Sequence, residues 1–383
     1  MKKILVVIIM VLACFFGLIG LFALLFKIFF SQPLVIVGNN ENNKVAVEEN
    51  NTVLEEEKKW QRVNVIILGH GGGVHAGGGL ADTLILMQIF PEKEKINLIS
   101  LPRDLWIKMP FSAQKDKETD FYSKINATLA IGNSGQQYQW RDEKYKGKNG
   151  GGELAKKVVS EIVGQEIDFY AAVDFAGFIK VVEIIGGKSG LKVAVPYSFV
   201  DEYYPIEGEE NNPCDYTEEE IATMTSELSG FELEKKFDCR YEKIEFKKGE
   251  SYLQAEELLK FVRSRHSGVN GGDFGRSLRQ QAVIQAIKDK LFSVTILPKL
   301  PEIMSKSFQL VKTDLDLEMV KKAIFDWGEV KDFQMETMVI DNKNYLKDSR
   351  SYNGQYILIP KLGIDNYDEI KEMVASQSAI LME

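Results

Sequence analysis

The sequence predicts an α/β domain in which helices cover a β-sheet, placed behind one membrane-spanning segment. Short apolar runs rich in β-branched residues, such as VNVIILG from Val63, alternate along the chain with helical patterns of apolar residues. A long apolar stretch also stands near the start of the chain. With 383 residues, the chain has room for one large domain or two ordinary ones.

The N-terminal stretch predicts a membrane anchor, residues 1–30. Every residue from Ile4 to Phe26 is apolar or Gly, which is long enough to cross a hydrocarbon core of about 30 Å. Because Lys2 and Lys3 precede it, we expect a cytoplasmic N-terminus and an exported remainder. Lipoprotein processing at Cys14 is the alternative, and the apolar run that continues beyond Cys14 counts against it.

Composition separates a polar linker, residues 31–62, from a folded domain, residues 63–383. The formal net charge of −9 argues against nucleic-acid partners, which bind basic surfaces. Two acidic stretches, Glu48 to Glu57 and Asp201 to Glu220, are predicted to be solvated loop or linker. The second belongs to an acidic insertion, residues 200–240.

Two cysteines flank most of that insertion. Cys214 and Cys239 would form a disulfide in an oxidising compartment, or they are two separate thiols. The three histidines, His70, His75 and His266, do not form a metal-binding Cys/His pattern. The glycine-rich segment after the first strand lacks the spacing and lysine of a phosphate-binding loop, so nucleotide binding is not predicted.

The remaining elements follow in order from period and turn signals. Strands are predicted at residues 63–69, 84–90, 96–101, 191–199, 335–340 and 354–360, with a further strand and turn beginning at Ile167. Helices are predicted at residues 152–163, 178–185, 251–261, 315–327 and 367–374, and a long one from about Phe274 to Phe292.

An arginine-rich stretch, residues 261–287, predicts an anion site. If Asp273 caps the long helix, then Arg276, Arg279 and Gln280 extend its apolar stripe, where unpaired charges are costly. If residues 262–265 are extended, Arg263 and Arg265 point to the same side. Guanidinium groups, a glycine-rich loop and a helix N-terminus favour phosphate. A solvated patch paired with surface carboxylates is the alternative.

A second cationic position follows the third strand. Arg103 and Asp104 stand directly after the strand that ends at Leu101. Polar groups at strand ends often line ligand crevices in α/β sheets, although an ion pair closing a turn is the simpler explanation.

Taken in order, NVIILG, ADT, LISLPRDLW, KIN, IDFYAAVDFAGF and LLKFVRSRHSGVNGGDFGRSLRQQ resemble motifs of the LytR-CpsA-Psr family of bacterial cell-wall proteins. The resemblance covers residues 63–292 and extends to the C-terminal elements. It implies a three-layer α-β-α fold with a central mixed, twisted sheet. It also implies a membrane-anchored, extracytoplasmic phosphotransferase that uses Mg²⁺ and moves a glycopolymer from a polyprenyl-pyrophosphate carrier to a peptidoglycan or other wall sugar hydroxyl.

The resemblance also assigns residues. Those expected to hold the pyrophosphate are Arg103, Lys124, Arg263, Arg265, Arg276 and Gln280. Asp82 is the expected Mg²⁺ ligand or takes the acceptor's proton, and Arg103, Arg263, Arg265 and Asp82 form the expected catalytic set. Asp104 would orient Arg103, and Asp273 and Arg279 would support the site.

This chain departs from the family pattern at two positions. Leu80 stands where the family usually has an arginine, and His70 and glycines stand where many members have an aspartate. Two other functions stay open: a polyprenyl-pyrophosphate hydrolase, and a non-catalytic module that binds wall polymer and regulates other machinery.

Overall fold

The computed structural model describes residues 62–73, 77–291, 293, 300–316 and 333–382. The predicted anchor, all but the last residue of the predicted linker and most of the predicted helix at residues 315–327 lie outside these ranges. Among the described residues, no helix combines the length and the apolar character that crossing a bilayer requires.

The domain is organised around a six-stranded sheet with the order β11-β6-β1-β2-β3-β12. These strands are β1 (Val63–His70), β2 (Ala81–Phe90), β3 (Lys95–Ser100), β6 (Phe169–Asp174), β11 (Lys312–Thr313) and β12 (Gln334–Val339). β1 pairs with β6 and β3 with β12 in parallel, and the other neighbours are antiparallel. The predicted mixed sheet is confirmed.

Alternate residues of β1 supply the cores on the two faces of the sheet. Val65 and Ile67 join one buried cluster, and Ile66 and Leu68 join the other. A strand buried on both faces has no polar side, which explains the continuous apolar run in the sequence.

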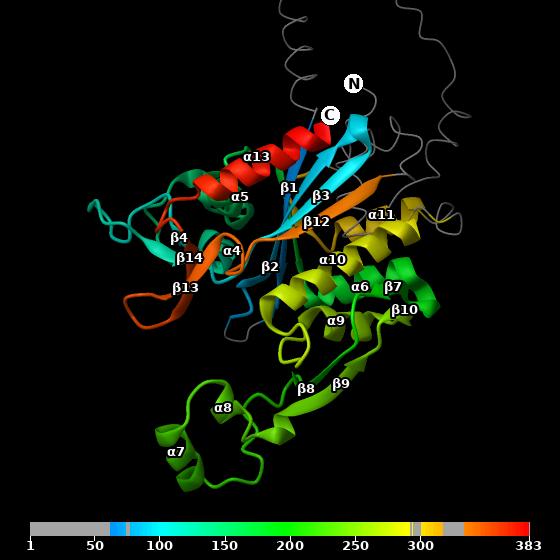
Figure 1. Cartoon of the computed structure of the whole chain (residues 1–383). Helices are drawn as coiled ribbons and strands as arrows, with labels where there is room; N and C mark the ends of the chain where they lie inside the picture. The colour runs from blue at the N-terminus through cyan, green and yellow to red at the C-terminus, as the bar shows by residue number, and fades with distance from the viewer. Residues whose placement is uncertain (1–61, 74–76, 292, 294–299, 317–332, 383) are drawn as a thin grey trace, which may run out of the picture.

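Helices cover both faces, as a three-layer fold requires (Figure 1). On one face lie α6 (Phe175–Gly186), α9 (Ala255–Arg263), α10 (Gly272–Leu291), α11 (Leu300–Phe308) and the ribbon β7 (Leu191–Val195) with β10 (Gly249–Leu253). On the other lie α4 (Thr128–Asn133), α5 (Gly150–Val163), α13 (Asp368–Met382), and the pairs β4 (Trp106–Lys108) with β5 (Tyr122–Lys124) and β13 (Leu346–Arg350) with β14 (Tyr356–Pro360).

Several sequence predictions of elements are wrong. Residues 251–253 belong to strand β10, so the helix predicted from Ser251 begins only at Ala255. The strand predicted over residues 191–199 is two strands, β7 and β8 (Phe199–Pro205), separated at Pro196. α10 begins at Gly272, which places Asp273 inside its first turn rather than at its cap.

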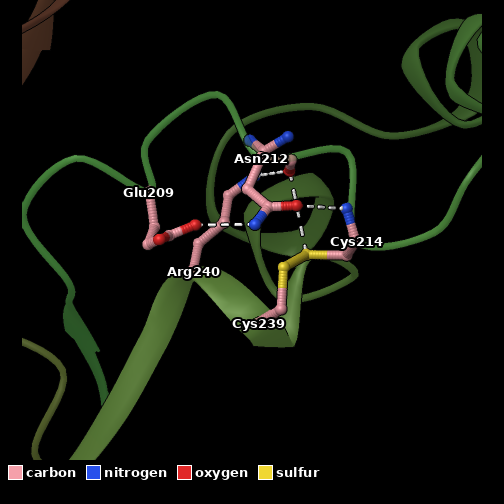
Figure 2. The surroundings of a disulfide bond; sticks show 5 residues. All are labelled: Glu209, Asn212, Cys214, Cys239 and Arg240. Carbon is pink, nitrogen blue, oxygen red and sulfur yellow. Dashed lines mark hydrogen bonds between the residues drawn. A yellow bond between two sulfur atoms is a disulfide. The ribbon is translucent and has the colours of Figure 1, made fainter.

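The insertion forms an arm that projects away from the sheet (Figure 1). β8 and β9 (Tyr241–Phe246) form its antiparallel base, and α7 (Glu218–Glu227) and α8 (Phe231–Glu234) lie between them. Cys214 and Cys239 form a disulfide with a Cα–Cα distance of 5.6 Å (Figure 2). The sequence left a disulfide and two separate thiols open, and the structure has the disulfide.

Candidate functional site

An apolar pocket of about 300 Å³ lies between the sheet and helices α6, α9 and α10. Its apolar lining comes from Ile85 and Val173 of the sheet, Phe175 and Phe178 of α6, Leu259 and Val262 of α9, and Val283, Ile284 and Ile287 of α10. Arg263, Arg265, Arg276 and Gln280 line the same pocket. The combination suits a ligand with an apolar body and an anionic head.

Arg263 reaches this pocket from the last residue of α9. Its guanidinium lies 4.3 Å from the ring centre of Phe175 and donates to the Tyr204 hydroxyl at 3.3 Å. Among the described residues, no carboxylate forms an ion pair with it. A guanidinium held on aromatic rings remains available to bind an anion.

The condition on which the sequence placed Arg263 and Arg265 on the same side, an extended segment over residues 262–265, is not met. α9 continues through Arg263, and Ser264 is the first residue after the helix. Arg265 therefore reaches the pocket from a loop, whereas Arg263 reaches it from a helix end. Both side chains still line the same pocket.

Asp201 holds this arginine-bearing loop in place. Its buried carboxylate accepts hydrogen bonds from the Ser264 hydroxyl at 2.7 Å and from the backbone N–H groups of Arg265 and His266 at 3.0 and 3.1 Å. Asp201 is 1% exposed, so the prediction that the whole stretch from Asp201 to Glu220 is solvated is wrong at its first residue. The arm therefore contributes directly to the site.

Arg265 and Arg276 share the carboxylate of Asp273. Each guanidinium lies 3.0 Å from Asp273 Oδ1. Burial by itself would raise the pKa of the Asp273 carboxyl, but Arg276, Arg265 and Arg103 outweigh it and lower that pKa. The carboxylate therefore stays ionised at neutral pH and is a weaker base than an ordinary aspartate.

Arg276 is the most deeply buried cation of the site. It is 5% exposed, and its Nε has no hydrogen-bond partner among the described residues. Burial, opposed by Asp273, lowers the pKa of Arg276 to about 10. The group stays charged at neutral pH, so its burial costs free energy that a bound anion would offset.

Arg279 is different, although the sequence placed it on the same stripe. Its side chain is fully buried and donates to the carbonyls of Phe261 (2.9 Å) and Ser264 and to the Tyr197 hydroxyl (2.7 Å). It does not line the pocket. Arg279 therefore fastens the end of α9 to α10, which agrees with its expected supporting role and not with an anion contact on the stripe.

Gln280 joins α10 to the sheet. Its amide Nε2 donates to the Thr83 hydroxyl of β2 at 2.8 Å. Thr83 and Asp82 lie within β2, which starts at Ala81 rather than at residue 84 as predicted. Both residues line the apolar pocket.

Arg103 and Asp82 form an ion pair across the strand ends of β2 and β3. Arg103 Nε also lies 3.5 Å from Asp104, whose other oxygen accepts from Lys124 Nζ at 2.5 Å. Burial acts to lower the pKa of Arg103, but Asp82, Asp104 and Asp273 outweigh it and raise that pKa. This geometry agrees with Asp104 orienting Arg103.

A second cavity, the polar chamber, has a volume of about 580 Å³ and meets the apolar pocket at Arg265. Its lining is Pro102, Arg103, Asp104, Lys124, Arg265, Gly271, Gly272, Asp273, Phe274, Ser277, Val339, Ile340, Asp341, Asn342, Lys343, Tyr356 and Leu358. Lys124 thus lies in the polar chamber, separate from the apolar lining.

The carboxylates of the site can be tested against the magnesium that the resemblance implies. No group of three or more His, Cys, Asp and Glu side chains gathers anywhere in the described ranges. Asp82 and Asp174 both line the apolar pocket, on the two strands that flank the end of β1. Mg²⁺ is usually held by one or two carboxylates plus substrate phosphates. This donor set fits an ion that arrives with a pyrophosphate rather than a preformed protein cage.

Comparison with known proteins identifies the family. The LytR_cpsA_psr family model matches residues 29–371. The chain belongs to the LytR-CpsA-Psr family. This LytR-CpsA-Psr protein also resembles the crystal structure of Bacillus subtilis TagV, with a TM-score of 0.52 and 22% identity, over 82% of this chain and 96% of that one. The structural likeness shows the fold.

Two curated relatives carry names that state an activity. The Bacillus subtilis polyisoprenyl-teichoic acid–peptidoglycan teichoic acid transferase TagV is 26% identical over 237 residues, which is 62% of this chain and 45% of TagV. The Enterococcus faecalis transferase TagU is 24% identical over 278 residues, 72% of this chain and 67% of TagU. The matched part thus spans less than half of TagV.

The structure brings together all the residues that the sequence selected for pyrophosphate, in or between two adjoining cavities. Sequence reasoning missed Asp201, Thr83, Asp174 and Tyr204. A polar residue inside an apolar strand could have signalled Thr83, but Asp201 looked like one more carboxylate of an acidic insertion.

Proposed function

We propose that this protein is a membrane-anchored, extracytoplasmic phosphotransferase. It would move a glycopolymer from a polyprenyl-pyrophosphate carrier to a sugar hydroxyl of the cell wall. The names of TagV and TagU describe those relatives as polyisoprenyl-teichoic acid–peptidoglycan teichoic acid transferases, which supports this class of reaction. One observation carries the proposal: an apolar pocket enclosed by the sheet and three helices is lined at one part by Arg263, Arg265 and Arg276. An isoprenoid pyrophosphate has this distribution of apolar and anionic groups.

The disulfide in the arm supports export. Disulfides persist in oxidising compartments and are rare in the cytosol. Cys214 and Cys239 are bridged, and the apolar stretch at residues 1–30 would anchor the exported domain.

Residues of the site support the departure of the leaving group in the proposed reaction. The acceptor hydroxyl oxygen bonds to the glycan-linked phosphorus, the bridging P–O bond breaks, and the polyprenyl phosphate leaves while the hydroxyl proton passes to water. Arg276, Arg265 and Arg263 stabilise the charge that develops on the leaving phosphate. Arg103 orients Asp82 through their ion pair. Asp82 and Asp174 would hold Mg²⁺, which would neutralise phosphate charge when bound.

The test uses the full chain in detergent micelles with a glycosylated polyprenyl pyrophosphate, with and without a wall acceptor and Mg²⁺. We expect polyprenyl phosphate release that requires the acceptor and leaves the glycan on it. Arg263→Ala combined with Arg265→Ala should abolish release while circular dichroism stays unchanged. Release without an acceptor would instead establish the hydrolase, and binding without release would establish the non-catalytic module.

A further inference from the structure

We propose that the polar chamber is the acceptor subsite, where a hexopyranose of the wall glycan places its hydroxyl against the transferred phosphorus. The inference rests on the proposed function and adds a place for the second substrate. The chamber's volume of about 580 Å³ lies within the usual range for small-molecule sites, roughly 300–1,000 Å³.

The position of the chamber follows from the geometry of phosphoryl transfer. Attacking and leaving oxygens lie roughly in line on opposite sides of the phosphorus. If the leaving polyprenyl phosphate occupies the apolar pocket, the attacking hydroxyl must enter from another side of the arginines. The polar chamber meets the apolar pocket at Arg265, and Arg103 lines the chamber beside it.

The chamber's lining suits a sugar better than a lipid. Lys124 and Asp104 pair at 2.5 Å on one wall, and they present charged hydrogen-bonding groups that suit hydroxyls. The segment after β12 and strand β14 continue the lining beside this pair, where the Leu358 N–H donates to the Asp104 carbonyl at 2.9 Å. There the Tyr356 ring is 44% exposed, with its hydroxyl donating to Asp348 at 2.8 Å. An exposed ring beside paired charges offers an apolar surface to a sugar ring and polar partners to its hydroxyls.

Lys343 adds a cation that is not paired within the described part of the chain. Its ammonium lies 4.6 Å from the ring centre of Phe274, and no carboxylate there lies within ion-pair distance. Lys343 and Tyr356 line the chamber but are not among the residues assigned to the pyrophosphate. They can therefore be changed without removing a pyrophosphate ligand.

The experiment measures binding of a soluble N-acetylglucosamine–N-acetylmuramic acid disaccharide to the full chain in micelles, by titration calorimetry. We expect Tyr356→Ala to raise the Kd at least tenfold and Lys343→Ala to raise it about threefold to tenfold. Tyr352→Ala is the matched control, because this tyrosine is 94% exposed on the same hairpin and does not line the chamber. It should bind like the wild type.

Three results would overturn the assignment. One is wild-type protein that does not bind the disaccharide, and another is an unchanged Kd in both Tyr356→Ala and Lys343→Ala. The third is a Tyr356→Ala variant that loses affinity only for glycosylated polyprenyl pyrophosphate, since the donor's sugar would then occupy the chamber. Disaccharide binding that Tyr356→Ala weakens, in a protein that shows no turnover, would support the chamber and refute the proposed transferase.

Discussion

Two regions of this protein each bury an arginine among few carboxylates, but the two guanidinium groups differ in how completely they are hydrogen-bonded. In the loop after α4, the Arg141 guanidinium donates to five backbone carbonyls, those of residues 132, 134, 137, 138 and 145. At the apolar pocket, Arg276 pairs with Asp273, and its Nε has no partner among the described residues. Burial lowers the pKa of both groups. Burial alone therefore does not mark a ligand site. Arg276 differs from Arg141 because an unpartnered Nε is combined with a place in the lining of the apolar pocket.

The largest effect is expected at Arg279. This residue lies one helical turn from Arg276, but its guanidinium donates to backbone carbonyls as that of Arg141 does. Arg279→Ala would leave the buried carbonyls of Phe261 and Ser264 without a donor. We expect a loss of about 3 to 5 kcal/mol in the free energy of unfolding, measured by urea denaturation. Arg350→Ala, on the exposed hairpin, should stay within about 0.5 kcal/mol of wild type. Unchanged stability in Arg279→Ala would contradict the fastening role.

At Arg276 we expect a substitution to lower turnover and to leave stability nearly unchanged. Arg276→Met keeps an apolar side chain in the pocket and removes the charge. We expect turnover to fall about 10²- to 10³-fold, or about 2.7 to 4 kcal/mol of transition-state stabilisation, as when one preorganised donor is removed. Stability should change little, because Arg265 still pairs with Asp273. Retained turnover together with lost stability would place Arg276 in the same class as Arg279.

The pH dependence of stability at acid pH tests the interaction between Asp273 and the arginines around it. A carboxyl whose pKa is lowered on folding contributes stability above its unfolded pKa, and that contribution is lost as pH falls through the folded value. The pKa of Asp273 lies below the ordinary value of 3.8. We therefore expect the stability difference between wild type and Asp273→Asn to be constant above about pH 5 and to shrink below about pH 4. If the stabilities of wild type and Asp273→Asn changed with pH in parallel, the arginines would not lower the pKa of Asp273.

The smallest expected effect concerns the contact between α10 and the sheet. Thr83→Val preserves shape and removes the acceptor for Gln280. We expect a loss of about 1 kcal/mol in stability and a fall in turnover of several-fold. Thr128→Val is the matched control, because its buried hydroxyl donates only to the Ile125 carbonyl, outside both cavities. If both changes lowered turnover equally, the hydrogen bond between Thr83 and Gln280 would have no specific role in the site.

Local signals, namely β-branched runs and helical periodicity, predicted a sheet covered by helices, and the local run of arginines predicted the anion site. The order of the motifs carried the family resemblance, which implied the mixed sheet and the two helical layers. Sequence reasoning failed where distant residues decide. Arg279 and Arg276 look equivalent on one helical stripe, and only the return of α9 past α10 places carbonyls beside one of them. Asp201 was predicted to be solvated, but β8 places it beside the loop at residues 264–266, where its carboxylate accepts hydrogen bonds. Residues 251–253 pair with β7, which overrides their helical period.

The central claim is that the apolar pocket and Arg276 together recognise an isoprenoid pyrophosphate. Its most direct test is thermal and urea unfolding of the full chain in micelles, with geranyl pyrophosphate or geranyl monophosphate added. At about 100 times its Kd, geranyl pyrophosphate should stabilise the wild type by about 2.7 kcal/mol. The monophosphate should stabilise it less, and Arg276→Met should not respond to the pyrophosphate. No stabilisation of the wild type, or equal stabilisation of Arg276→Met, would contradict the claim.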